Sequence, residues 1–132
     1  MKLLLDTHLL LWAAAGGGGP SGALPPAAER LLVDPENQLR FSAASLWEVS
    51  IKTSLGRNDF KVDPDLLRRG LLDNGYIEVP VTSAHAAAVS HLPPIHKDPF
   101  DRMLVAQATA EGVVLLTSDK VLASYPGPIQ LV

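Results

Sequence analysis

The sequence contains no cysteine, few aromatic residues and no long uninterrupted hydrophobic run. Without cysteine the chain cannot form a disulfide or a thiolate metal site, which fits a reducing compartment. Aromatic residues make up 5% of the chain, so leucine, valine, isoleucine and alanine must fill the core. No stretch reaches the roughly 18 apolar residues that a membrane-spanning helix needs. We therefore expect no contact with a membrane.

The sequence also lacks an excess of positive charge. Its 11 lysine and arginine residues stand against 14 aspartate and glutamate residues, which gives a formal net charge of −3. A protein that binds duplex DNA through a broad basic face is usually basic. A local basic cluster or a bound cation can still attract nucleic acid, so the composition excludes only the broad basic face.

What remains is the composition of one globular domain. Hydrophobic residues make up 47% and charged residues 19% of the 132 residues, which is not the composition of a disordered chain. The length suits a single domain over residues 1–132. Lys2 and the leucines after it superficially resemble a signal peptide, but Asp6 and His8 would interrupt its apolar segment. We therefore expect a soluble cytoplasmic domain.

Short apolar runs alternate with helical patterns along the chain. We expect strands at Leu3–Leu5, Gln38–Phe41, Tyr76–Val81, Val113–Leu116 and Ile129–Val132. Helices are expected at Leu9–Trp12, Ala27–Val33, Ala43–Leu55, Asp65–Asp73, Ala84–His91 and Asp98–Gly112. This alternation predicts an α/β protein with a central, mostly parallel sheet.

Two local features have more than one interpretation. The glycine- and proline-rich break Gly16–Pro26 cannot hold a helix or a strand. It is interpreted as a surface loop, with a flap beside a functional site as the alternative. Within the helix expected at 43–55, Trp47, Ile51 and Leu55 recur every four residues and mark an apolar face. Trp47 is therefore expected in the core or in an interface, as is Trp12.

Four acidic residues occupy equivalent places in this pattern. Asp6 directly follows the first strand, and Glu48 lies in the helix after the second. Asp101 opens the helix after a proline-rich loop, and Asp119 follows the strand 113–116. Strands of a parallel sheet with right-handed crossovers end at one edge. We therefore expect the four carboxylates to meet there.

Carboxylates that meet at one edge repel one another, which raises their pKa values unless a cation neutralises them. Oxygen ligands without cysteine or histidine select a hard ion, Mg²⁺ or Mn²⁺. Such an ion activates water and stabilises charge on a phosphoryl group. The residues therefore predict metal-assisted phosphodiester hydrolysis.

Most of these acids also have a simpler interpretation. Asp98 suits the N-cap of the helix that follows it, so we assign capping to Asp98 and leave Asp101 for the site. Asp119 could cap the last helical turn, and Glu48 could form a surface pair with Lys52 one turn on. An acid directly after a buried strand, as Asp6 is, needs partners of its own.

Four segments resemble the signature segments of a known family. LLLDTHLLLW, SAASLWEVSIK, HKDPFDRMLVAQA and LLTSD look like those of PIN-domain ribonucleases, most closely the VapC toxins of VapBC toxin–antitoxin modules. The segments fall in the family's order and span residues 1–119. The run Gly16–Gly19 departs from the family between motifs, which puts the shape of that loop in doubt and leaves the chemistry alone.

The resemblance implies a three-layer α/β/α sandwich and a Mg²⁺- or Mn²⁺-dependent endoribonuclease that hydrolyses RNA. It implies a catalytic and metal-binding quartet of Asp6, Glu48, Asp101 and Asp119. It also implies a homodimer and inhibition by a cognate VapB-type antitoxin. Thr7 and Ser118 match the small hydroxyl residues beside the first and last acid of the family. Lys97, Arg102, Lys120 and Lys52 could hold phosphates. With His96 and Asp98, which lie beside these residues in the sequence, they complete the candidate accessory or RNA-binding set.

Other enzymes also place an aspartate after the first strand. A haloacid-dehalogenase-like phosphatase needs a second aspartate where this chain has His8. A response-regulator receiver needs an acidic pair where Asp6 stands alone, and a phosphoacceptor after the third strand, where this chain has Pro80. The alternatives that remain are a PIN-like module that binds RNA or protein without cutting, and a housekeeping RNA-processing nuclease.

Overall fold

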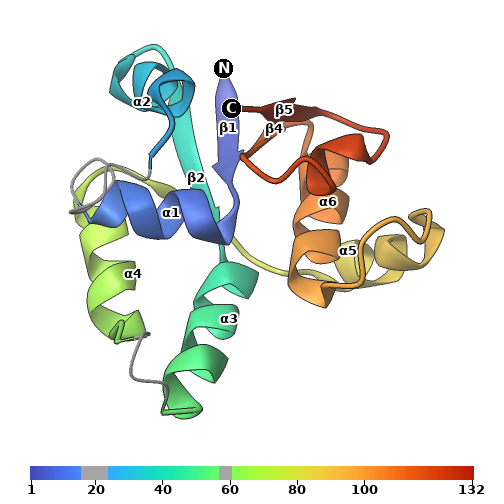
Figure 1. Cartoon of the computed structure of the whole chain (residues 1–132), viewed down its shortest axis with the longest axis horizontal. Helices are drawn as coiled ribbons and strands as arrows, with labels where there is room; N and C mark the ends of the chain where they lie inside the picture. Colours follow the sequence, from blue (N-terminus) through green and yellow to red (C-terminus); the bar gives the residue numbers. More distant parts are fainter. Residues whose placement is uncertain (16–23, 57–60) are drawn as a thin grey trace.

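The computed structural model describes residues 1–15, 24–56 and 61–132. Within these ranges the chain forms a five-stranded sheet in the order β3-β2-β1-β4-β5 (Figure 1). The strands are β1 (Lys2–Leu5), β2 (Gln38–Ser42), β3 (Ile77–Val79), β4 (Val114–Thr117) and β5 (Ile129–Leu131). Every neighbouring pair is parallel, which confirms the predicted α/β class and sheet.

Helices cover both faces of the sheet. They are α1 (Thr7–Ala14), α2 (Pro26–Val33), α3 (Ala43–Ser54), α4 (Pro64–Asp73), α5 (Ser83–Ala88) and α6 (Pro99–Glu111), with 3₁₀ turns η2 (Val89–His91) and η3 (Leu122–Ser124). One apolar cluster joins the sheet to α1, α2, α3 and α4, and a second joins it to α6 and η3. The three-layer α/β/α architecture is therefore confirmed.

Strand β1 lies at the centre of the sheet and is buried on both faces. Leu3 and Leu5 belong to the first apolar cluster and Leu4 to the second, because successive side chains of a strand point to opposite faces. All three are fully buried. A strand covered on both sides needs no polar alternation, which explains why a plain run of leucines predicts it correctly. The chain leaves β1 at Asp6.

Some element boundaries differ from the prediction. Strand β3 ends at Val79 rather than Val81, since Pro80 has no amide hydrogen for a ladder. Helix α5 ends at Ala88 and continues as η2. The Gly16–Gly19 run lies outside the described residues, as does most of the predicted loop 16–26. Within the described part of the chain, no helix is long and apolar enough to cross a membrane.

Helix α3 buries a different face from the one expected. Trp47 is 64% exposed and Leu55 66%, while the buried positions are Ala44, Ser45, Glu48 and Val49. Small residues let the helix approach the sheet closely, so they outweigh the larger apolar residues in setting its rotation. The prediction that Trp47 could be a core residue is wrong. Trp12, by contrast, is partly buried against the first cluster.

A buried polar contact fixes α6 against the sheet. Ser42 caps α3 as predicted, accepting from the amide of Ala44, and its hydroxyl donates to Oε1 of Gln107. The amide nitrogen of Gln107 donates to the carbonyl of Pro80. Gln107 is fully buried, so one side chain ties the ends of β2 and β3 to the helix that carries Asp101.

Replacing Gln107 tests this contact. Gln107→Ala leaves the Ser42 hydroxyl and the Pro80 carbonyl without their partner and opens a cavity, so we expect a loss of about 2–4 kcal/mol in the free energy of unfolding. Urea denaturation followed by circular dichroism measures it. Gln130→Ala, at an exposed position of β5, should change stability by less than about 0.5 kcal/mol. Equal midpoints for both variants would contradict the role of Gln107.

Candidate active site

Asp6 is held rigidly where β1 ends. Its Oδ1 accepts the amide of Leu9 at 2.9 Å, which makes it the N-cap of α1. Its Oδ2 accepts the hydroxyl of Thr117 from the end of β4. The carboxylate is 3% exposed, and the amide of Asp6 continues the strand pairing by donating to the carbonyl of Leu116 at 3.1 Å. A buried acid with this many fixed contacts has a defined orientation.

Glu48 lies on the buried side of α3, with only 4% of its surface exposed. Its Oε2 pairs with Nζ of Lys52 at 2.9 Å. Its Oε1 is buried and has no hydrogen-bond partner among the described residues. The predicted i,i+4 pair with Lys52 therefore exists, but it is not a surface pair, and it accounts for one of the two oxygens.

Asp101 and Asp119 meet at His96. The Nε2 atom of His96 lies 3.4 Å from Oδ2 of Asp101 and 3.3 Å from Oδ2 of Asp119. One potential ligand atom from each of these residues falls within 4.8 Å of the others. The Nδ1 atom of His96 accepts the amide of Asp98 at 3.0 Å, so in the neutral ring the proton resides on Nε2 and points at the carboxylates.

Electrostatics links Asp101 to the other acids. The pKa of Asp101 is raised to about 7: burial is the main cause, the charge of Asp98 acts in the same direction, and His96 opposes the change. Glu48 and Asp6 add smaller upward contributions to the same pKa. Mutual repulsion is what the sequence predicts for carboxylates gathered at one edge.

The two acids that lie next to strands β1 and β4 behave differently. Burial raises the pKa of Asp6, and the charge of Asp119 adds to this, against hydrogen bonds from Thr117 and Leu9. For Asp119 burial also acts upward, but amide hydrogen bonds from Val121 and Leu122 and the contact with His96 outweigh it and lower the pKa. Asp119 thus accepts the amides of the turn that leads into η3, close to its simpler interpretation as a capping residue, and its charge also acts on Asp6.

These residues fit a divalent cation. Glu48 contributes a buried oxygen without a donor, and Asp101 resists ionisation in the absence of positive charge. With its Nε2 protonated, His96 offers the two carboxylates a hydrogen rather than a lone pair. The lone pairs that face the cluster are therefore carboxylate oxygens, the ligands that Mg²⁺ and Mn²⁺ prefer.

Only part of the accessory set lies at this cluster. His96 is central to it, and Asp98 caps α6 by accepting the amides of Phe100 and Asp101, as assigned. Thr7 is buried and its hydroxyl donates to Ser45 rather than to an acid. Lys97 and Lys120 are exposed and Ser118 is half-buried.

Arg102 holds the loop before α6. Its Nη1 donates to the carbonyl of Pro93 and to the hydroxyl of Tyr125, both at 3.0 Å, and its Nη2 donates to the carbonyl of Val89. The Tyr125 hydroxyl in turn accepts the amide of His96 at 2.8 Å. These contacts place Arg102 as a support for His96, through Tyr125, rather than at the acids.

Sequence reasoning missed Thr117 and Tyr125. Thr117 donates to Asp6, and its hydroxyl also accepts the amide of Asp119 at 3.0 Å, so it links two acids. The pairing of Leu5 with Leu116 puts Thr117 opposite Asp6, a register that needs the sheet order. Tyr125 carries no comparable sequence signal, because its partners His96 and Arg102 lie more than twenty residues away.

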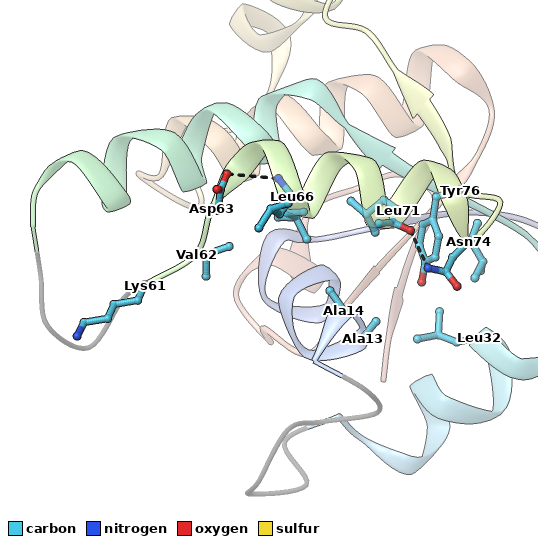
Figure 2. A pocket seen from close by; sticks show the side chains of 13 residues that line it. Ala13, Ala14, Leu32, Lys61, Val62, Asp63, Leu66, Leu71, Asn74 and Tyr76 are labelled. Carbon is cyan, nitrogen blue, oxygen red and sulfur yellow. Dashed lines mark hydrogen bonds between the residues drawn. The ribbon is translucent and has the colours of Figure 1, made fainter.

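A pocket of about 730 Å³ opens elsewhere, between α1, α2 and α4 (Figure 2). Its wall is largely apolar and includes Leu32, Leu66 and Leu71, with Asn74 and Tyr76 at one end. None of the four acids is among its described lining residues. The pocket is therefore separate from the acidic cluster.

Comparisons with known proteins agree with this architecture. A family model described as the PIN domain matches residues 3–128. Similar solved structures include VapBC2 from Rickettsia felis bound to a DNA fragment from their promoter, with a TM-score of 0.69 and 14% identity over 99% of this chain and 98% of that chain.

Two further solved structures are similar. DNA-bound VapBC from Salmonella typhimurium has a TM-score of 0.65 and 16% identity over 98% of this chain and 97% of that chain. VapBC-1 from nontypeable Haemophilus influenzae has a TM-score of 0.60 and 17% identity over 99% and 98%. At sequence identities this low, the structural similarity shows that the chains share a fold and nothing further. No curated protein sequence matches the chain.

The opposite pKa shifts of Asp101 and Asp119 predict opposite mutational effects without metal. A carboxyl whose pKa is raised on folding favours the unfolded state once the pH exceeds its unfolded value. Asp101→Asn should therefore stabilise the metal-free protein by about 1–3 kcal/mol at pH 8 and hardly at all near pH 4. Thermal unfolding in a chelator at both pH values measures this.

Asp119→Asn is the matched control. Its lowered pKa means that ionised Asp119 stabilises the fold above its unfolded pKa, a contribution that is lost as the pH falls. The variant should melt below the parent at pH 8, and the difference should shrink in acid. A melting temperature of Asp101→Asn at or below that of the parent at pH 8 would refute the assignment of strain to Asp101.

Proposed function

We propose that this chain, which belongs to the PIN-domain family, is a metal-dependent endoribonuclease and the toxin of a type II toxin–antitoxin pair. The observation that carries the proposal is the buried, unpartnered Oε1 of Glu48, together with the Asp101 carboxyl, whose pKa is raised to about 7 by burial and by other acids, Glu48 among them. Burial and like charges make it costly to ionise these carboxyl groups, and a bound cation removes that cost, so the site favours a cation.

Asp101, Asp119 and Glu48 would hold the cation, with Asp6 as the fourth acid. When bound, Mg²⁺ or Mn²⁺ lowers the pKa of water and offsets the charge that develops on the phosphodiester. The hydrogen bonds from Leu9 and Thr117 keep the Asp6 carboxylate in one orientation. His96 Nε2–H holds Asp101 and Asp119 side by side before RNA arrives.

The partners follow from the same family. The similar structures are those of VapBC proteins, so we propose that a VapB-type antitoxin binds and inhibits this chain. A homodimer and a cytoplasmic location are part of the same proposal. A PIN-like module without catalysis is the alternative, and the presence of all four acids in one set of electrostatic contacts disfavours it. A housekeeping nuclease would cut RNA but would need no antitoxin.

Removing one negative charge tests the catalytic role. Asp6→Asn keeps the shape of the side chain and its bond with Leu9, so the fold should persist while metal-dependent cleavage of RNA falls about 100-fold or more. Cleavage of a labelled RNA with Mg²⁺ or Mn²⁺, resolved on a gel, measures the rate. Glu36→Gln, which removes one negative charge at an exposed position, should cleave as the parent does. Undiminished cleavage by Asp6→Asn would overturn the mechanism.

Metal binding can be measured without any RNA. Because the folded site binds the ion and the unfolded chain does not, Mg²⁺ at about 100 times its dissociation constant adds about 2.7 kcal/mol of stability. Millimolar Mg²⁺ or Mn²⁺ should raise the melting temperature of the parent by about 3 °C or more. The increase should be smaller for Glu48→Gln and should disappear with a chelator. A melting temperature that neither ion moves would count against the site.

A further inference from the structure

Trp47 lies exposed on α3, the helix that also carries Glu48. It is 64% exposed on α3, whereas Trp12 is partly buried against the core. Its ring packs edge to face against Phe100, with centroids 5.2 Å apart and planes at 77°. A large aromatic side chain left in water, yet fixed by a second ring, has a defined orientation and an open surface.

The ring pair spans the two helices that supply acids to the site. Trp47 immediately precedes Glu48 on α3, and Phe100 immediately precedes Asp101 on α6. Helices α3 and α6 contact each other, and the Trp47–Phe100 contact lies between them. Neighbouring side chains on a helix point in different directions, so the exposed Trp47 ring lies on the outer side of α3 while the Glu48 side chain is buried. The ring pair therefore joins the outer surfaces of the two helices that carry Glu48 and Asp101.

We propose that Trp47, supported by Phe100, stacks on an unpaired base of the RNA substrate next to the scissile phosphate. Single-stranded RNA is recognised by bases stacked on aromatic side chains, a contact that every base can make. The inference rests on the proposed ribonuclease function and deepens it: the substrate is single-stranded at the cleavage point, since a paired base has no free face.

The size of the patch favours a base over a protein partner. The exposed apolar residues on this face of α3 are Trp47, Ile51 and Leu55. Even an aromatic side chain buries at most about 250 Å², whereas a stable protein interface needs about 800 Å² per partner. The proposed homodimer would need a larger surface than these three residues provide, whereas one base needs only the open face of the Trp47 ring.

Fluorescence can observe the stacking directly. Trp12→Phe leaves Trp47 as the single tryptophan of the chain. A single-stranded RNA of about eight nucleotides, added in Ca²⁺, which takes the same oxygen ligands as Mg²⁺ in another geometry, should quench its emission. An oligomer of equal length and charge without bases should leave the emission unchanged. Equal quenching by both oligomers would overturn the proposal.

Affinity separates stacking from other uses of the same face. Trp47→Ala should weaken RNA binding by about 5- to 100-fold, Trp47→Phe should retain most of it, and Trp47→Leu should not. Leu55→Ala, which removes an exposed apolar side chain two turns further along α3, should bind RNA as the parent does. If Trp47→Leu binds RNA as tightly as the parent, the contact needs only an apolar side chain and the inference is wrong. It is also wrong if Trp47→Ala changes only self-association in sedimentation, because the face is then a protein contact.

The two levels of the proposal fail differently. If the parent cleaves RNA and Trp47→Ala binds and cleaves equally well, the stacking inference fails while the ribonuclease function stands. If the emission of Trp47 is quenched by RNA but the parent cleaves no RNA with Mg²⁺ or Mn²⁺, the chain is a binding module and the enzymatic proposal fails.

Discussion

The burial of a carboxylate at the end of the central strand is the constraint on which the rest of the structure depends. Asp6 follows three leucines that are fully buried, so it cannot reach bulk water without breaking the end of β1. The amide of Leu9 and the hydroxyl of Thr117 compensate for its desolvation. One of these contacts starts α1 and the other fixes the end of β4, so a single acid connects strand, helix and neighbouring strand.

The other acids carry a cost that the fold does not remove. Burial and like charges act against the ionisation of Asp101, and one oxygen of Glu48 has no donor among the described residues. A protein selected only for stability would replace such groups, because an unpaired buried polar atom is expensive. The charges of Glu48 and Asp101 act on each other across α3 and α6. Lys52 and His96 reduce the electrostatic cost of these acids without removing it. This is expected of a site whose acids are neutralised by a bound cation.

The sequence predicts this site well where the information is local. The step from buried strand to acid locates Asp6, and the motif Asp98–Asp101 separates the acid that caps α6 from the acid that contacts His96. It predicts poorly where packing decides. The recurrence of Trp47, Ile51 and Leu55 suggested an inward face, but Ala44 and Ser45 allow closer approach and leave that face outside. Thr117 and Tyr125 act across long separations, so their roles emerge only when the strand order and register are known.

The bond between Asp6 and Thr117 joins residues 111 positions apart, and this separation has a consequence for synthesis. A chain leaves the ribosome from its N-terminus, so Asp6 appears early but cannot find its partner until β4 has been made. Until then, the edge of β1 that pairs with β4 in the folded protein has no partner strand. The contact between Asp6 and Thr117, and the approach of Asp119 to the other acids, therefore cannot form until residues 114–119 have been made.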